Sequence, residues 1–84
     1  MFSLYILQSE ADNSYYIGHT KNREQRLWEH NFGRTGYSST KRPWKLIYFE
    51  EYSTKKEAFR REQYIKSLKN RKYIENLINT HLGP

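Results

Sequence analysis

The segment Leu4–Gly18 reads LYILQSEADNSYYIG, with two short apolar and aromatic runs on either side of a polar stretch. Residues 2–7 and 15–18 are rich in types that favour β-strands, and the Ser, Asp and Asn residues between them favour a turn. We therefore predict a β-hairpin. If odd positions of the first strand pair with even positions of the second, Tyr5 and Tyr16 lie on the same face of the sheet.

The segment after the hairpin is predicted to be a helix with a cationic face. It begins at the capping-box pattern Asn22–Gln25 and is expected to run to about Asn31. Arg23, Arg26 and His30 share one stripe of this helix, where a helix that covers a core would place apolar side chains. The stripe is either a solvated face or a surface that binds an anion.

The rest of the chain supplies a third strand and two more helices. Residues 32–44 are expected to form a loop, and Lys45–Tyr52 a strand whose unbroken apolar centre indicates burial on both faces and a central position in the sheet. Helices are predicted over about 55–68 and from Asn70 onward. We expect one α/β (α+β) domain over residues 1–84, with a small three-stranded antiparallel sheet flanked by helices in the order ββαβαα.

Composition narrows the class of protein. An aromatic content of 17% favours a folded chain despite a mean hydropathy of −1.08. The absence of cysteine excludes disulfides, thiolate metal sites and a cysteine nucleophile. No apolar run is long enough to span a bilayer, and the N-terminus does not resemble a signal peptide, so we expect a cytoplasmic protein with no membrane partner.

A net charge of +6 and a pI near 9.7 favour a polyanionic partner, most often nucleic acid, although charge for solubility alone is the alternative. The loop is rich in hydroxyls and cations, which are the groups that contact phosphates. We predict nucleic-acid contacts at Arg23, Ser38, Thr40, Lys41 and Arg42. An ordinary solvated loop has the same composition.

Glu62 breaks the pattern of the second long helix. Ala58, Phe59 and Ile65 define its inward face, and Glu62 lies in the middle of that face. A buried carboxylate needs a cation, a metal ion or a raised pKa. One interpretation is a salt bridge across the sheet, for instance to Arg26. The other is a ligand for Mg²⁺, which one carboxylate with waters and substrate phosphates suits.

Together these residues could cleave a phosphodiester, although each alone is more often a packing or surface residue. Tyr5 or Tyr16 could accept a proton from water if nearby cations pull its pKa below about 10. Arg26 offers a planar, permanently charged fork for phosphate oxygens. Glu62 could hold the metal ion, and His30 could assist by hydrogen bonding or proton transfer.

The ordered set of motifs resembles the GIY-YIG nuclease superfamily over about residues 2–78. Leu4-Tyr5-Ile6 stands at the first motif, with Leu in place of its Gly, and Tyr16-Ile17-Gly18 matches the second motif in full. The resemblance places Arg26 at the motif arginine, His30 at a position that is Tyr or His in related nucleases, and Glu62 at the metal-binding glutamate. His19 stands where some repair nucleases carry Lys.

The resemblance is closest to small single-domain members often described as excinuclease-subunit-C-like. It implies a DNA endonuclease that depends on Mg²⁺ (or Mn²⁺), with catalytic residues Tyr5, Tyr16, Arg26, His30 and Glu62, and a role in DNA repair or in processing branched or damaged DNA. No further DNA-binding domain follows, so the target is chosen by this domain or by a partner protein.

Two other classes stay open at this point. One is a nucleic-acid-binding module that has the fold without turnover. The other is a subunit or interaction protein that uses exposed aromatic side chains, for which Trp28, Phe32 and Tyr37 are the candidates.

Overall fold

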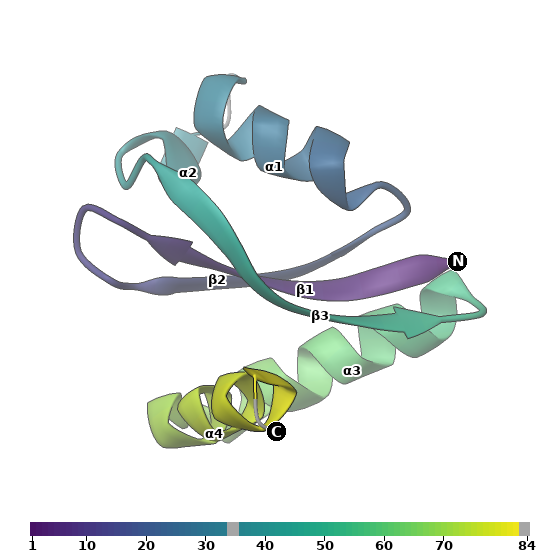
Figure 1. Ribbon diagram of the computed structural model, residues 1–84. Coiled ribbons are helices and arrows are strands. Elements are labelled where there is room, and N and C mark those ends of the chain that lie inside the picture. The colour runs from purple at the N-terminus through teal and green to yellow at the C-terminus, as the bar shows by residue number, and fades with distance from the viewer. Residues whose placement is uncertain (34–35, 83–84) are drawn as a thin grey trace.

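A computed structural model describes residues 1–33 and 36–82 and contains one three-stranded antiparallel sheet. The strands are β1 (Phe2–Ser9), β2 (Tyr15–Thr20) and β3 (Trp44–Tyr52), and they lie in the order β2-β1-β3 (Figure 1). The predicted hairpin is therefore confirmed as β1 and β2. Leu7 pairs with Tyr16 and Tyr5 with Gly18, which is the odd-to-even register.

The prediction that β3 is the central strand is wrong, because β1 occupies that position. The apolar run of β3 is buried at Tyr48 and partly buried elsewhere because helices lie on both faces of the sheet (Figure 1), and not because strands flank it on both sides. Ile47 is an extra residue at a bulge, since Ile6 pairs with Tyr48 and Leu7 with Leu46. The bulge places two consecutive residues, Ile47 and Tyr48, in the same cluster of the core, while Leu46 packs in the opposite cluster.

Helices α1 (Arg23–Phe32) and α2 (Gly36–Ser39) lie on one side of the sheet, and α3 (Lys55–Leu68) and α4 (Arg71–Leu82) on the other (Figure 1). The four-residue α2 lies within the segment that we predicted to be loop, and the long elements follow the predicted order ββαβαα. Asn22 caps α1 by accepting from the Gln25 amide, and Thr54 and Glu57 form a complete capping box at α3.

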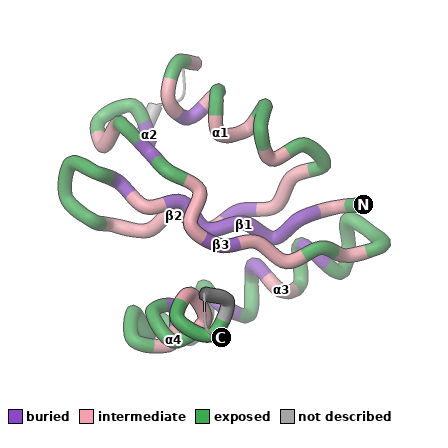
Figure 2. Tube along the Cα trace, viewed as in Figure 1, coloured by how far each residue is buried: buried purple, intermediate pink, exposed green. Residues whose placement is uncertain are grey.

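The side chains of β1 divide the core into two clusters. Leu4 and Ile6 face α3 and α4, where they pack with Ile65 and Ile74. Tyr5 and Leu7 face the other way and pack with Trp44, Tyr16 and Leu27. Buried segments concentrate along β1 in Figure 2, while the outer surfaces of the helices are exposed. Because side chains alternate along a strand, Tyr5 faces the side of the sheet that carries α1, whereas Leu4 and Ile6 face the side that carries α3.

The edge strand β2 packs against α3 on one face of the sheet, and on the other face its Tyr16 ring contacts His30 of α1. Tyr16 packs with Tyr5 on one face of the sheet, and His19 contacts Glu62 of α3 on the other, as expected for residues an odd number of positions apart in a strand. Groups from both faces can therefore meet around this edge. Within residues 1–33 and 36–82, no helix combines the length and apolar content needed to cross a membrane.

Candidate active site

The Tyr5 side chain extends across β2 at Gly18, the residue with which it pairs. A Cβ atom on Gly18 would lie 2.6 Å from the Tyr5 hydroxyl oxygen and 2.8 Å from Cζ, which is closer than real Cβ contacts. Glycine at this position therefore makes room for the phenol. The tyrosine is 2% exposed.

Two groups from α1 hold the Tyr5 hydroxyl. Arg26 donates from Nε over 3.3 Å, and His30 Nε2 lies 3.2 Å from the same oxygen. Arg26 and His30 are four residues apart, so one turn of α1 presents both to the phenol. The hydroxyl oxygen accepts from the guanidinium, which leaves its own proton free to donate to His30 Nε2 when that imidazole is neutral.

Burial sets the protonation of this pair. It raises the pKa of Tyr5 to about 12, outweighing the Arg26 hydrogen bond, which acts in the opposite direction. Burial and then the Arg26 charge lower the pKa of His30 to about 4. At neutral pH the phenol is protonated and the imidazole is neutral, so the condition that we set for Tyr5 as a proton acceptor, a pKa below its usual value, is not met in this arrangement.

The assignment of the proton on His30 follows from the same contacts. If Nε2 accepts from Tyr5, the imidazole proton resides on Nδ1. That atom is buried and has no hydrogen-bond partner in the described part of the chain. A second proton on this ring would add a charge in an apolar surrounding, which agrees with the lowered pKa of His30.

Tyr16 stands beside Tyr5 with a different set of contacts. The two tyrosine rings are nearly parallel, with centroids 6.3 Å apart. The Tyr16 ring also meets the His30 ring edge to face, with centroids 4.4 Å apart. The structure therefore confirms that the two tyrosines share a face. Unlike Tyr5, Tyr16 makes no hydrogen bond through its hydroxyl with any residue of segments 1–33 and 36–82. This phenol is available to a water molecule or a substrate.

The guanidinium of Arg26 links Tyr5 to the surface. Its Nη1 forms an ion pair of 2.9 Å with Glu29, and its side chain is 37% exposed. A cavity of about 300 Å³ opens here and is bounded by Arg26, Glu29 and His19 together with the turn from β2 into α1. Because the cavity is lined by polar side chains and Arg26 is permanently charged, it is suited to bind an anion such as a phosphate.

Glu62 enters from the opposite face of the sheet and is 6% exposed. Its Oε1 lies 2.6 Å from His19 Nδ1, and its Oε2 lies 2.7 Å from Lys66 Nζ. The ion-pair interpretation of Glu62 is thus observed in this structure, but with His19 and Lys66 as partners and not with Arg26, which pairs with Glu29. Burial is the main cause of the raised pKa of Tyr5, and the Glu62 charge adds a smaller contribution in the same direction.

The donor set around Glu62 fits a hard divalent ion held by a single carboxylate. Among residues 1–33 and 36–82 no group of three or more His, Cys, Asp and Glu side chains could enclose a metal ion. Mg²⁺ keeps most of its waters and needs only one or two carboxylates besides substrate phosphates. Lys66 is 47% exposed, so it can leave Glu62 for solvent when another cation takes its place.

The predicted nucleic-acid contacts in the loop are engaged within the protein. Arg42 donates to the carbonyls of His30, over 2.6 Å from Nε, and of Gly33, at the end of α1. Lys41 pairs with Asp12 at 2.5 Å. Such contacts give Arg42 and Lys41 structural roles whether or not they also meet a phosphate.

The other three predicted contacts differ in exposure. Thr40 is exposed, whereas Ser38 is 3% exposed and its carbonyl accepts from the Trp44 indole over 2.8 Å. Arg23 donates to Ser3 over 2.7 Å and lies 3.6 Å above the centre of the Phe49 ring. Of this set, Thr40 is the residue whose side chain faces solvent most fully in the structure.

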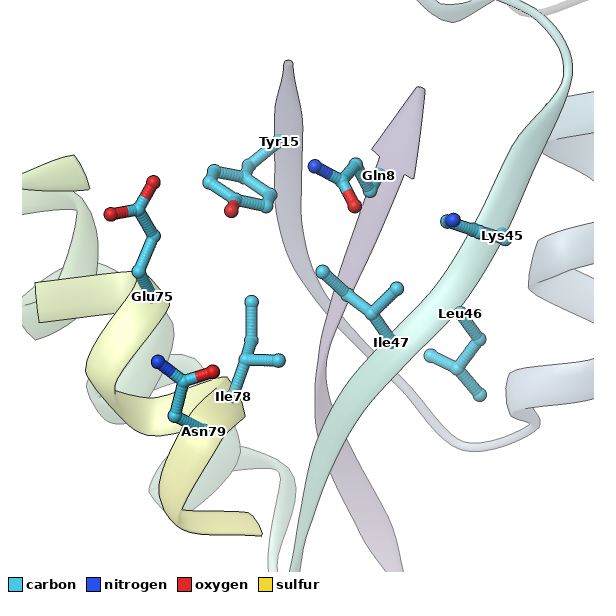
Figure 3. Close-up of a pocket in the computed structure, with 8 residues that line it drawn as sticks. All are labelled: Gln8, Tyr15, Lys45, Leu46, Ile47, Glu75, Ile78 and Asn79. Carbon is cyan, nitrogen blue, oxygen red and sulfur yellow. The ribbon is translucent and has the colours of Figure 1, made fainter. Parts of the chain in front are cut away.

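A larger cavity lies away from these groups. It measures about 590 Å³ and opens between α4 and the sheet, with Tyr15, Ile47 and Ile78 on its walls (Figure 3). Lys45 and Glu75 lie at its margins. It includes none of the predicted catalytic residues, and its position on the Leu4 side of the sheet separates it from the Tyr5 hydroxyl.

Sequence reasoning missed three partners of the predicted residues. Glu29 and Lys66 lie three and four positions after Arg26 and Glu62, a helical spacing that could have identified both ion pairs. His19 is 43 positions from Glu62, and no local signal joins them.

The chain is similar to known proteins over most of its length. The family model described as the GIY-YIG catalytic domain matches residues 1–76. The UPF0213 protein YazA of Bacillus subtilis is 41% identical over 82% of this chain and 74% of its own length. A UPF0213 protein of Bacillus licheniformis is 47% identical over 84% of this chain and 76% of its own.

The same likeness extends to a solved structure. The solution NMR structure of the UPF0213 protein BH0048 from Bacillus halodurans aligns with a TM-score of 0.62 and 31% identity, and the alignment covers 100% of this chain and 89% of that one. The names of these relatives state no activity.

Proposed function

The chain belongs to the GIY-YIG nuclease family, and from this membership and the groups at the edge of β2 we propose that it is a divalent-metal-dependent DNA endonuclease. Its substrate would be a phosphodiester bond in branched or damaged DNA, and the protein would act in the cytoplasm. A net charge of +6 supports a polyanionic substrate. A partner protein could direct it to its target.

The observation that carries the proposal is the meeting of three elements around one strand edge. Tyr5 from β1 is held by Arg26 and His30 from α1, and Glu62 from α3 contacts His19, which follows the Gly18 that Tyr5 crosses. Positive charge, hydroxyls and a buried carboxylate are what hydrolysis of a phosphodiester requires: charge neutralisation, orientation of water and a site for a cation.

Each side chain has a distinct task in this scheme. Arg26 holds a phosphate oxygen with the part of its fork that is free of Tyr5 and Glu29. Tyr5, protonated and fixed by Arg26 and neutral His30, orients the neighbouring phenol and the substrate. Tyr16, whose hydroxyl is unengaged by described residues, contacts the attacking water. Glu62 would hold Mg²⁺ (or Mn²⁺), which when bound neutralises phosphate charge and lowers the pKa of a coordinated water.

A cleavage assay tests the proposal directly. Plain, nicked, flapped and branched DNA are incubated with the protein and Mg²⁺, with EDTA and the variant Glu62→Gln as matched controls. We expect cleavage of at least one substrate, lost in EDTA and in the variant. Equal cleavage by wild type and Glu62→Gln would remove Glu62 from the mechanism.

The second candidate is a nucleic-acid-binding module without turnover. Two observations favour it: both oxygens of Glu62 are already paired with His19 and Lys66, and the pKa of Tyr5 is raised rather than lowered. Salt-dependent DNA binding without cleavage of any substrate in Mg²⁺ or Mn²⁺ would establish this module in place of the nuclease.

A further inference from the structure

A stripe of four side chains runs along α3 beside the edge of β2. Lys55, Phe59, Glu62 and Lys66 are spaced by four, three and four residues, so they lie in line on one face of the helix. The stripe covers about 16 Å of helix axis, given a rise of about 1.5 Å per residue. Glu62, the candidate metal ligand, lies between the aromatic ring and the second lysine.

Phe59 is exposed in a place where it contributes little to the core. Its exposed fraction is 46%, whereas Ala58 and Ile65 on the inward face are almost fully buried. Its ring meets the His19 ring edge to face, with centroids 5.5 Å apart, and His19 in turn contacts Glu62. A ring supported on one side and open on the other is a platform on which a planar group can stack.

The stripe carries a lysine at each end, and its acidic member, Glu62, is paired with Lys66. Lys55, Lys56 and Arg60 are exposed and form no ion pair with a residue of segments 1–33 and 36–82. The remaining α3 arginine, Arg61, faces the other way and is bound to Glu50 over 2.9 Å. The stripe thus joins an aromatic platform to cations, which is the combination used to bind single-stranded nucleic acid.

We propose that this stripe, Lys55–Phe59–Lys66, binds one strand of nucleic acid next to Glu62, with a base stacked on Phe59 and phosphates on the lysines. A base can stack on a side chain only when it has left its neighbours in the strand. The substrate therefore has an unpaired nucleotide beside the bond that is cut, as in single-stranded DNA or at a branch. The inference rests on the proposed function for the position of cleavage, but the binding itself requires no turnover.

Binding is measured by fluorescence anisotropy in EDTA, with a short labelled single-stranded DNA and the same strand in a duplex. Phe59→Ala is expected to weaken single-strand binding about tenfold and to leave duplex binding unchanged, whereas Phe59→Trp retains the affinity. Tyr64→Ala is the matched control, because Tyr64 is a 51% exposed aromatic on the opposite face of α3, and it should bind as wild type. Circular dichroism melts verify that each variant is folded.

The cations are tested by salt dependence. Lys55→Ala should lower the slope of log affinity against log salt by about 1, and Lys72→Ala on α4, an exposed lysine away from the stripe, should leave it unchanged. Single-strand binding by Phe59→Ala equal to wild type, or weakened equally in Phe59→Ala and Tyr64→Ala, would overturn the inference.

The outcomes separate this inference from the nuclease. If Phe59→Ala loses single-strand affinity while the wild type cleaves nothing, the binding stripe stands and the nuclease fails. If the wild type cleaves and Phe59→Ala binds normally, the nuclease stands and the stripe fails.

Discussion

Gly18→Ala tests whether the glycine of the second motif exists to admit the Tyr5 phenol. The new Cβ would lie 2.6 Å from the phenol oxygen, and ordinary contact begins at 3.4 Å, so the hydroxyl must move by roughly 0.8 Å. Tyr5 is 2% exposed and cannot simply swing into solvent. Its hydrogen bond from Arg26, already 3.3 Å long, would be lost.

Both stability and activity should fall. Overpacking of a core costs about 1–3 kcal/mol, and the lower entropy of unfolded alanine offsets about 0.5–1 kcal/mol of this. We expect the free energy of unfolding to drop by about 1–2 kcal/mol, which lowers the melting temperature of a chain of this size by roughly 5–15 °C. Displacement of the phenol should lower the cleavage rate about 100-fold.

A double-mutant cycle with Tyr5→Phe assigns the effect to this contact. Removing the hydroxyl eliminates the shortest clash, but the new Cβ still lies 2.8 Å from Cζ of the ring. Tyr5→Phe should therefore relieve only part of the strain that Gly18→Ala introduces, with a coupling energy of about 0.5–1.5 kcal/mol between the two substitutions. Thermal denaturation of all four proteins gives the coupling. Additive losses, or a Gly18→Ala protein as stable and active as wild type, would refute the reasoning.

Three further predictions concern the charged groups of the site. Glu62→Gln should abolish Mg²⁺-dependent cleavage but lower the free energy of unfolding by only about 1 kcal/mol, because His19 and Lys66 are 22% and 47% exposed and stay hydrated. A thermal melt that shows a loss above about 3 kcal/mol would identify a structural ion pair instead. Arg26→Lys should keep the fold and lose most of the activity, since a lysine cannot reproduce the planar fork, and wild-type turnover in the cleavage assay would contradict this. The pKa of His30 is about 4 in the folded protein and about 6.5 in the unfolded chain. Its contribution to the free energy of unfolding, about 3 kcal/mol, is therefore present above pH 6.5 and is lost as the pH falls toward 4. Urea denaturation at about pH 7 and pH 4.5 should show this loss in wild type and a smaller one in His30→Phe; equal losses would exclude His30 as the cause.

Much of the fold followed from local pattern. The alternation of residues in β1 determined which of its own side chains share a face, whereas the shared face of Tyr5 and Tyr16 depended on the odd-to-even register that the structure supplied. Capping boxes marked where α1 and α3 begin, because a cap is a hydrogen bond between residues only three apart. The order of the long elements and the membership of the nuclease family were also predictable from the sequence.

The lateral order of the strands was not predictable, and the β3 prediction failed for a definite reason. The faces of a strand are buried by the elements that pack above and below the sheet. Its lateral position depends instead on which strands form backbone hydrogen bonds with it. Two helical layers give β3 the apolar sequence of a central strand although it lies at an edge (Figure 1).

The chemistry of the site divides in the same way. The sequence indicated Glu62 as a buried carboxylate, and its partner Lys66 lies within one helical turn. The pairing of Glu62 with His19, and the raised pKa of Tyr5, exist only after the sheet brings distant residues together. Helical and strand periodicity determine which way a side chain faces, because they are properties of neighbouring residues. Burial and charge pairing decide its protonation, and they depend on contacts between residues far apart in the chain, which tertiary packing alone creates.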